Sequence, residues 1–312
     1  MSHKKQVVLL IKIILTLVIL YFLARQVEKN WVEIKDYDWR FNIGYLIISI
    51  ICGLLAFLMF TLSWRGIIGS FGYRVKIPEA FKIMYLSNLG HYIPGKIWQL
   101  FGILYLTREK GIPTEPAVTS FVIFQLFTIP ASLLLFVLSS QWDSRILIDQ
   151  VRLLGPYSAV LLTFGMLAFC AVLVFWTSPI LKVVNYILEK LSRPPLTFHL
   201  DKKVALMIFL GYFFSWVLYG CAFWFFITAV SEVYPVGLIA AMGIFALSYQ
   251  VGYLVLFAPG GFGPREVVMG ALLVPFLGPV AAAVAVLARL WTIVIEASAA
   301  VISFFIKINN NS

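Results

Sequence analysis

The stretch LFAPGGFGPREVVMG, residues 256 to 270, interrupts a long apolar region with glycines, prolines and charge. Its run PGGFGP is followed at once by Arg265 and Glu266. An uninterrupted membrane helix contains none of these near its middle, since broken backbone and charged side chains are both costly in lipid. The stretch therefore predicts a break in a membrane helix, and we expect that break to have a functional role.

The composition of the whole chain indicates that this break lies in a membrane. Hydrophobic residues make up 62% of the 312 residues and charged residues 12%, which is far from the composition of a soluble globular domain. Runs such as PYSAVLLTFGMLAFCAVLVFW, residues 156–176, are long enough as helices to cross a hydrocarbon core about 30 Å thick. We expect an all-α polytopic membrane protein.

Six apolar segments are long enough to be full transmembrane helices. Two further apolar regions, 79–109 and 235–275, each have a Pro-Gly pair near the middle and are expected to be re-entrant hairpins. The first span follows MSHKK, as in a signal peptide, but no small-residue cleavage site follows it, so we expect it to be retained. The six expected spans are residues 7–23, 43–63, 115–138, 156–177, 204–230 and 279–305.

The loop charges favour re-entrant hairpins. If the amino terminus is cytoplasmic and both hairpins return to the side they entered from, most loop lysines and arginines are cytoplasmic, as the positive-inside rule requires. If the first region crossed the membrane once, the basic loop 178–203 would lie outside. We expect both termini on the cytoplasmic side of the inner (plasma) membrane. Two proline-kinked spans, giving eight crossings, are the alternative.

The order span, span, hairpin, span occurs in 1–138 and again in 156–312, within one membrane domain covering 1–312. An odd number of crossings per half inverts the second copy. Inverted repeats whose broken helices meet near the midplane are a transporter design. The outer loop 139–155 joins the halves, and the loop 178–203 has one apolar helical face, which predicts an amphipathic helix at the cytoplasmic interface.

The residues at the two breaks predict an anion site. Glycine permits positive φ, proline suits the first turn of a new helix, and the free N–H groups of that turn point at the tip. Lys96 and Arg265 follow the breaks, and Arg289 lies in the last span. A lipid phosphate is the anion that must cross the bilayer core. The break residues are Pro94 and Gly95 in the first hairpin, and Pro259, Gly260, Gly261, Gly263 and Pro264 in the second.

Two acidic residues accompany these cations. Glu266 or Glu296 is expected to pair with Arg289, and the pair has either a structural role or a role in substrate binding or proton coupling. His91 is either a hydrogen-bonding residue or a proton relay. The polar residues expected near the lipid phosphate are Asn88, His91, Gln99 and Gln250.

Other function classes find little support. The net charge of +10 is scattered through short loops, which argues against nucleic acid, and three cysteines inside spans with three separate histidines indicate no metal or cofactor. The outer segment RQVEKNWVEIKDYDWR would suit an intramembrane glycosyltransferase, but its acids alternate with lysine and arginine, which favours a solvated segment. A non-catalytic partner of a lipid-modifying enzyme or glycosyltransferase is the third alternative, and an oligomer is compatible with all three. The acids concerned are Glu28, Glu33, Asp36 and Asp38.

Two motifs resemble a known family. APGGFGPREVVMGALL, followed by the Ala-rich helix with Arg289, and the earlier SNLGHYIPGKIWQLFG are similar to the membrane region of the lysylphosphatidylglycerol synthase and flippase family, which includes the multiple peptide resistance factors. The resemblance covers nearly the whole chain. It implies a flippase-like protein for anionic phospholipids, aminoacyl-phospholipids or polyprenyl-phosphate glycolipids, with membrane lipids as its partners. The matching residues are Pro94, Gly95, Pro259, Gly260, Gly263, Arg265, Glu266 and Arg289.

The sequence departs from that family in two respects. The soluble aminoacyl-transferase domain of full-length resistance factors is not present, so lysyl transfer is not expected. The first motif has Lys96, Ile97 and Trp98 after its Pro-Gly, and is poorer in glycine than the family pattern. The leading hypothesis is a lipid transporter rather than an enzyme.

Overall fold

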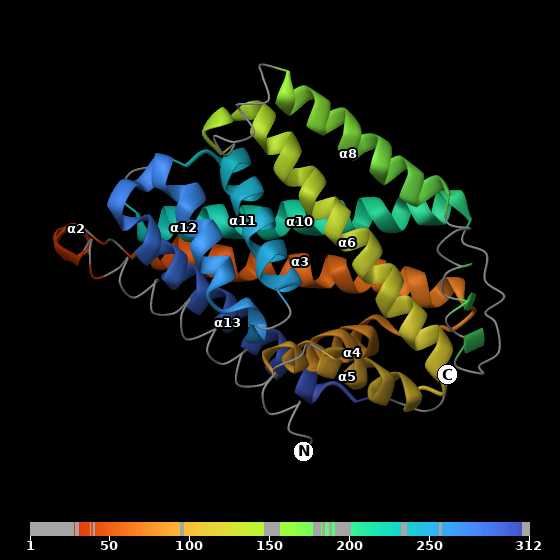
Figure 1. Ribbon diagram of the computed structural model, residues 1–312. Coiled ribbons are helices and arrows are strands. Elements are labelled where there is room, and N and C mark those ends of the chain that lie inside the picture. The colour runs from red at the N-terminus through yellow and green to blue at the C-terminus, as the bar shows by residue number, and fades with distance from the viewer. Residues whose placement is uncertain are drawn as a thin grey trace, which may run out of the picture.

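The computed structural model describes most of the chain as helices. The described residues are 28, 31–37, 39, 41–93, 97–146, 157–176, 182, 185–186, 189–190, 201–231, 236–255 and 258–307, and they contain no strand. Figure 1 shows the helices crossing one another in a bundle. Several are long and apolar enough to span a bilayer, so the chain is an all-α polytopic membrane protein, as the composition predicts.

Three long helices form the frame: α3 (Ile43–Ser70), α6 (Thr114–Trp142) and α10 (Lys202–Val230). Each is about 42 Å long, more than a hydrocarbon core needs. Asn42 begins α3 by accepting the N–H of Tyr45 at 3.1 Å. The helices begin close to where the sequence predicts spans, at 43, 115 and 204. They continue beyond the predicted ends of the first two, to Ser70 in α3 and to Trp142 in α6.

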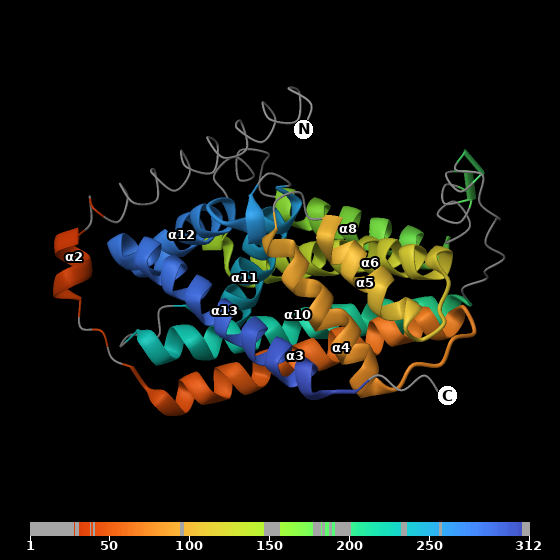
Figure 2. The ribbon, with the colours of Figure 1, turned by 90° about the horizontal axis from the view of Figure 1, so that it is seen from below.

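Helices α3 and α10 pack closely and antiparallel. Small residues permit this, since a Cβ on Gly66 would lie 3.2 Å from the Cγ1 of Ile208, and Gly211 in α10 faces Ser63 in α3 in the same way. Figure 2 shows this pair as one layer, with α6 and α11 among the helices above it. The residues at these contacts between α3 and α10 are uncharged.

The first broken region is a hairpin of two short antiparallel helices, α4 (Ile77–Asn88) and α5 (Ile97–Arg108), with the 3-10 turn η1 (Leu89–Tyr92) at its tip. Near the open end, Lys110 Nζ lies 3.1 Å from Glu79 Oε1. Near the tip, a Cβ on Gly90 would lie 2.5 Å from the backbone N of Gln99. Each helix is about 18 Å long, too short to cross a core of about 30 Å, so the chain returns toward its starting level.

The second broken region consists of α11 (Leu238–Leu254), the turn η3 (Pro259–Gly261) and α12 (Pro264–Leu277). The apolar sequence then continues, but the chain turns back at η4 (Gly278–Val280), where Gly278 has φ 57°. The last helix, α13 (Ala281–Phe305), packs antiparallel to α12 and confirms the helix predicted at 279–305.

The remaining helices lie at the periphery. Helix α8 (Ser158–Phe175), predicted as a span over 156–177, packs on α6, and Cys170 contacts the backbone of Pro130. The short helix α2 (Trp31–Asp36) contacts η4, and η2 (Ser144–Ile146) follows α6. The predicted first span 7–23 lies outside the described residues, as do most of the loop 178–203 and much of 139–155.

The distribution of side chains is that of a membrane protein. Its interior is rich in aromatic residues such as Trp64, Tyr219 and Phe223, while large apolar residues including Phe164 and Phe304 are exposed on the outside. An apolar outer surface would be a liability in water but matches lipid tails. Charged residues in the interior therefore need a separate explanation.

Candidate functional site

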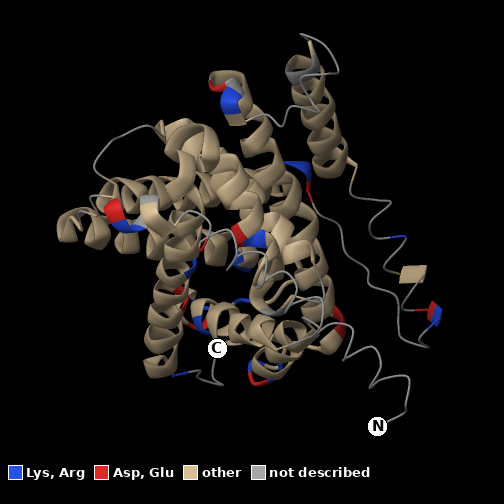
Figure 3. Ribbon diagram, turned by 60° about the vertical axis from the view of Figure 1, so that its left-hand side comes forward, with Lys and Arg blue, Asp and Glu red and all other residues tan. Residues whose placement is uncertain are grey.

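Four charged side chains of α12 and α13 are buried: Arg265, Glu266, Arg289 and Glu296 are each only 3 or 4% exposed. Figure 3 shows charged residues at the helix ends and also within the bundle. Buried ionisable residues in membrane helices are expensive and usually mark a functional site. We call these four residues the charge cluster.

The second break has the glycines that the sequence predicts, each in a conformation that requires glycine. Gly260, Gly261 and Gly263 have φ of 57°, 76° and 94°. Space is also limiting, because a Cβ on Gly260 would lie 2.6 Å from Arg289 Nη2 and 2.9 Å from Cδ1 of Tyr92. The turn therefore lets α13 bring its arginine against the backbone.

Pro264 and Glu266 begin α12. Proline has no N–H to satisfy at the first position of the helix, and the Glu266 carboxylate accepts the N–H of Gly263 at 2.6 Å through its Oε2. One N–H at this helix start is thus already bound by the protein itself. An anion at this tip would therefore depend on the arginines more than on the helix end.

Arg289 pairs with Glu266 rather than with Glu296. Its Nε lies 3.7 Å from Glu266 Oε1, and its Cζ lies 4.3 Å from the ring centre of Phe262. The 3.7 Å between Arg289 Nε and Glu266 Oε1 is within ion-pair distance but is too long for a hydrogen bond. Both Nε and Nη2 of Arg289 lack a hydrogen-bond partner among the described residues.

Arg265 lies over two aromatic rings. Its Cζ is 4.5 Å from the ring centre of Tyr249 and 5.2 Å from that of Phe245, which stabilises the cation in a buried place. In the part of the chain that the structure describes, Arg265 forms no ion pair, and its Nη2 has no hydrogen-bond partner. Arg265 is therefore the cation of the cluster that no carboxylate neutralises directly.

Glu296 joins α13 to the tip of the first hairpin. The Tyr92 hydroxyl donates to Glu296 Oε2 at 2.6 Å, and His91 Nε2 lies 3.7 Å from the same oxygen. The Tyr92 ring also faces Arg289, whose Cζ is 5.5 Å from its centre. The two breaks, far apart in the sequence, therefore meet at α13.

The polar residues predicted near the first tip are gathered there. Gln99 Nε2 donates to Asn88 Oδ1 at 3.2 Å, and His91 Nδ1 lies 2.5 Å from the carbonyl oxygen of Asn88. Pro94, Gly95 and Lys96 lie outside the described residues, and so does the side chain of Pro259.

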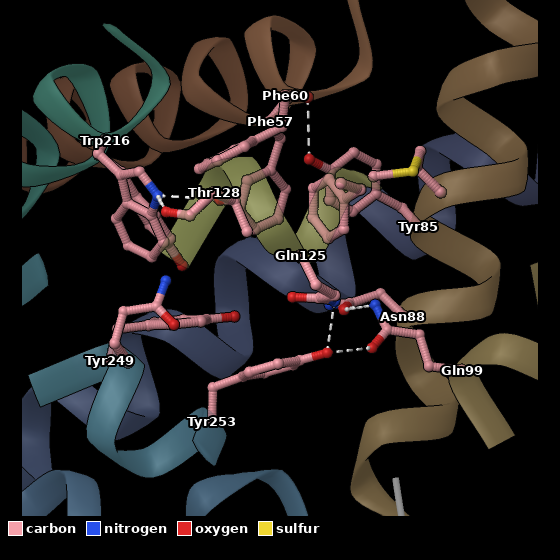
Figure 4. Close-up of a pocket in the computed structure, with 14 residues that line it drawn as sticks. Phe57, Phe60, Tyr85, Asn88, Gln99, Gln125, Thr128, Trp216, Tyr249 and Tyr253 are labelled. Atoms are coloured by element: carbon pink, nitrogen blue, oxygen red, sulfur yellow. Dashed lines mark hydrogen bonds between the residues drawn. The ribbon is translucent and has the colours of Figure 1, made fainter. Parts of the chain in front are cut away.

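A cavity lies beside the charge cluster and encloses about 70 Å³ of space for water-sized molecules. Figure 4 shows its aromatic rings on several sides and its amide side chains near Tyr253, whose hydroxyl accepts from Gln125 Nε2 at 2.5 Å. Tyr249 lines the cavity with the same ring over which Arg265 lies. The lining combines large aromatic faces with the amides of Asn88, Gln99, Gln125 and Gln250.

Several of these residues cannot be found from the sequence. Tyr92, Tyr249 and Tyr253 are ordinary aromatic residues in an aromatic-rich chain, and only packing brings their rings to the charges. Gln125 was also missed, although an amide in the middle of the span predicted at 115–138 is a signal that could have found it.

The acidic outer segment lies elsewhere. Glu28 and Asp36 are exposed, and α2 contacts η4, at the end of α12 away from the charge cluster. The Glu33 side chain and Asp38 lie outside the described positions. Within the described ranges, no group of three histidine, cysteine or acidic side chains could hold a metal ion.

Comparison of the sequence with known protein families finds a match to one family. The family model described as "Lysylphosphatidylglycerol synthase TM region" matches residues 9–297, which includes both breaks and all four residues of the charge cluster. No curated protein matches the chain.

Proposed function

The chain belongs to the lysylphosphatidylglycerol synthase TM-region family, and we propose that it binds an anionic, phosphate-bearing lipid at the charge cluster and moves it between the leaflets. The family supports a membrane function related to lipids. The more specific function is argued from the buried charges and the cavity beside them.

The observation that carries the proposal is a set of buried guanidinium nitrogens that have no acceptor among the described residues: Arg265 Nη2, Arg289 Nε and Arg289 Nη2. Buried N–H groups are nearly always hydrogen-bonded, and the exceptions call for an explanation such as a bound ion. Guanidinium groups bind phosphate through paired, charge-assisted hydrogen bonds. A lipid phosphate would satisfy these nitrogens and neutralise Arg265.

The cavity supports a headgroup with hydroxyl groups. Two buried polar atoms in its lining, the Tyr219 hydroxyl and Gln250 Oε1, have no hydrogen-bond partner in the described part of the chain. The amide oxygen can only accept, while the phenol is best placed to donate. A hydroxyl group serves both, whereas an ammonium group only donates. Aromatic faces beside amides also suit the apolar and polar sides of a polyol.

The arrangement of the helices suits transport more than catalysis. Two broken regions meet at one place, as in transporters whose inverted halves rock about a central site. The apolar outer face would keep the acyl chains in lipid while the headgroup enters the bundle. We place the protein in the inner membrane with both termini cytoplasmic, working alone or beside a lipid-modifying enzyme.

Binding of a short-chain lipid by the detergent-solubilised protein tests the site. We expect dihexanoyl phosphatidylglycerol to bind, and Arg265→Gln to weaken it roughly 10- to 100-fold, the worth of one charge-assisted hydrogen bond. Dihexanoyl phosphatidylmethanol has the same charge without the hydroxyl groups and should bind more weakly than the glycerol lipid.

The matched control is Arg145→Gln. Arg145 also lies over an aromatic ring, with its Cζ 4.3 Å from the ring centre of Phe276, but its side chain is 52% exposed and paired with Asp143. Its replacement should leave binding unchanged. Equal binding by wild type and Arg265→Gln would contradict the site, and equal binding of both lipids would contradict the hydroxyl-bearing headgroup.

A further inference from the structure

His91 Nε2 and Glu296 Oε2 face each other, and both are hydrogen-bond acceptors when the imidazole is neutral and Nδ1 carries its hydrogen. His91 Nδ1 lies at hydrogen-bonding distance, 2.5 Å, from the carbonyl oxygen of Asn88, which can only accept, so Nδ1 carries the hydrogen. In a neutral imidazole, Nε2 then bears a lone pair, and this atom lies 3.7 Å from Glu296 Oε2. One added proton would turn two facing acceptors into a donor and an acceptor.

The net charge of the cluster also indicates that a proton accompanies the lipid. Arg265 and Arg289 carry two positive charges, and Glu266 and Glu296 carry two negative charges, so these four residues are neutral together. A lipid phosphate that enters adds one negative charge in a buried place, where an uncompensated charge is costly. A positive charge must accompany it.

Glu266 is poorly placed to accept that charge as a proton. Its Oε2 accepts the Gly263 N–H at 2.6 Å, and its Oε1 lies 3.7 Å from the guanidinium of Arg289, a permanent cation that favours the ionised carboxylate. Glu296 instead has the neutral Tyr92 hydroxyl and His91 beside Oε2. The Oε1 atoms of both glutamates lack a hydrogen-bond partner among the described residues, so the neighbouring arginine is what distinguishes them.

We propose, resting on the lipid-phosphate function above, that the protein takes up one proton, shared by His91 and Glu296, for each lipid phosphate that it binds. The proton comes from water and forms the Nε2–H bond of His91, which then donates toward Glu296. The lipid brings one negative charge and the proton one positive charge, so the net charge of the site does not change. Release of lipid on the other side returns the proton to water there.

Among the residues that the structure describes, few groups compete with His91 near Glu296. Besides His91, Tyr92 and Arg289, the described titratable neighbours of Glu296 are phenols on three helices: Tyr85 on α4, Tyr219 on α10 and Tyr249 on α11. Each phenol is neutral in its ordinary form and supplies no positive charge. From α12, Arg265 and Glu266 are the described charged residues nearest to the site.

Calorimetric titration of the full-length protein with dihexanoyl phosphatidylglycerol, in two buffers that differ in ionisation enthalpy, counts the protons. This lipid is a phosphodiester whose own charge does not change near neutral pH, so any proton uptake belongs to the protein. We expect one proton per bound lipid, and an affinity that strengthens about tenfold for each unit decrease in pH, as linkage requires.

Glu296→Gln tests the location of the proton. The amide oxygen can still accept from Tyr92, so the fold should persist, and lipid should bind with no proton uptake. Glu79→Gln is the matched control, because Glu79 is also buried and paired but at the open end of the first hairpin, and it should leave proton uptake unchanged.

The outcomes separate this inference from the proposed function. Failure of wild type to bind the lipid would contradict the proposed function itself. Binding by wild type without proton uptake would overturn only the coupling, and would point to Lys96 as the balancing charge. Unchanged proton uptake in Glu296→Gln would overturn the assignment to His91 and Glu296.

Discussion

At the scale of single residues, the site depends on glycine as much as on charge. Gly260 has φ 57°, and both Arg289 and Tyr92 approach the position that a Cβ would occupy. The glycine turn therefore decides how close α13 and the tip of the first hairpin come to each other. Arg265 and Glu266 can serve the site only because this turn directs the start of α12 into the bundle.

Gly260→Ala should abolish lipid binding. The new methyl group would lie 2.6 Å from Arg289 Nη2, and the guanidinium would have to leave its present position beside Glu266. Titration with dihexanoyl phosphatidylglycerol measures the effect.

Gly278→Ala is the control for backbone strain. Gly278 has the same φ of 57°, but nothing lies within 4 Å of the position of its Cβ. Its ψ of −134°, compared with 12° at Gly260, lies close to a region that only glycine adopts readily, so alanine there should cost about 1 to 3 kcal/mol of stability and should still leave binding intact. Equal losses of binding in both variants would show that strain rather than the Arg289 contact is responsible.

At the scale of elements, the two breaks differ in kind. The first is a symmetric hairpin of 12-residue helices, while the second has a 17-residue helix before its turn and a 14-residue helix after it. The lengths of α4 and α5, about 18 Å each, are what a re-entrant hairpin requires. This geometry makes a direct topological test possible.

Single cysteines at Lys76 and Glu109, both exposed at the open end of the first hairpin, should react with a membrane-impermeant maleimide from the same side of the membrane. The background would have Cys52, Cys170 and Cys221 replaced. We expect labelling from the cytoplasmic side for both positions. Labelling from opposite sides would show that this region crosses the membrane once.

At the scale of the whole molecule, hydropathy and the positions of the Pro-Gly pairs predict the architecture well. Runs of apolar residues locate the long helices, and the Pro-Gly pairs locate both breaks, because local backbone chemistry controls those features. The partner of Arg289 could not be chosen from the sequence, since Glu266 and Glu296 both lie at suitable spacings. The close approach of Arg289 to the turn at Gly260 places its guanidinium beside Glu266, and this approach is a tertiary contact that the sequence does not show.

The aromatic part of the site was not predictable for a similar reason. The Tyr92 ring faces Arg289 only because the tip of the first hairpin meets α13. The Tyr249 ring faces Arg265 because α11 packs on α12, and the Phe262 ring faces Arg289 because α13 packs beside the second break. Nothing in the local sequence distinguishes these residues from the many aromatic residues that only fill space. Charged residues in spans are rare and could be recognised individually, whereas their aromatic neighbours could not.

We propose that the protein moves a phosphate-bearing lipid between leaflets through the charge cluster. The most direct measurement is the fraction of fluorescent phosphatidylglycerol that dithionite can bleach from outside proteoliposomes. Wild type and Arg145→Gln should expose inner-leaflet lipid to the reagent, whereas Arg265→Gln should leave it protected, as in protein-free liposomes. Protection of the inner leaflet with wild type, or equal exposure with Arg265→Gln, would contradict the account.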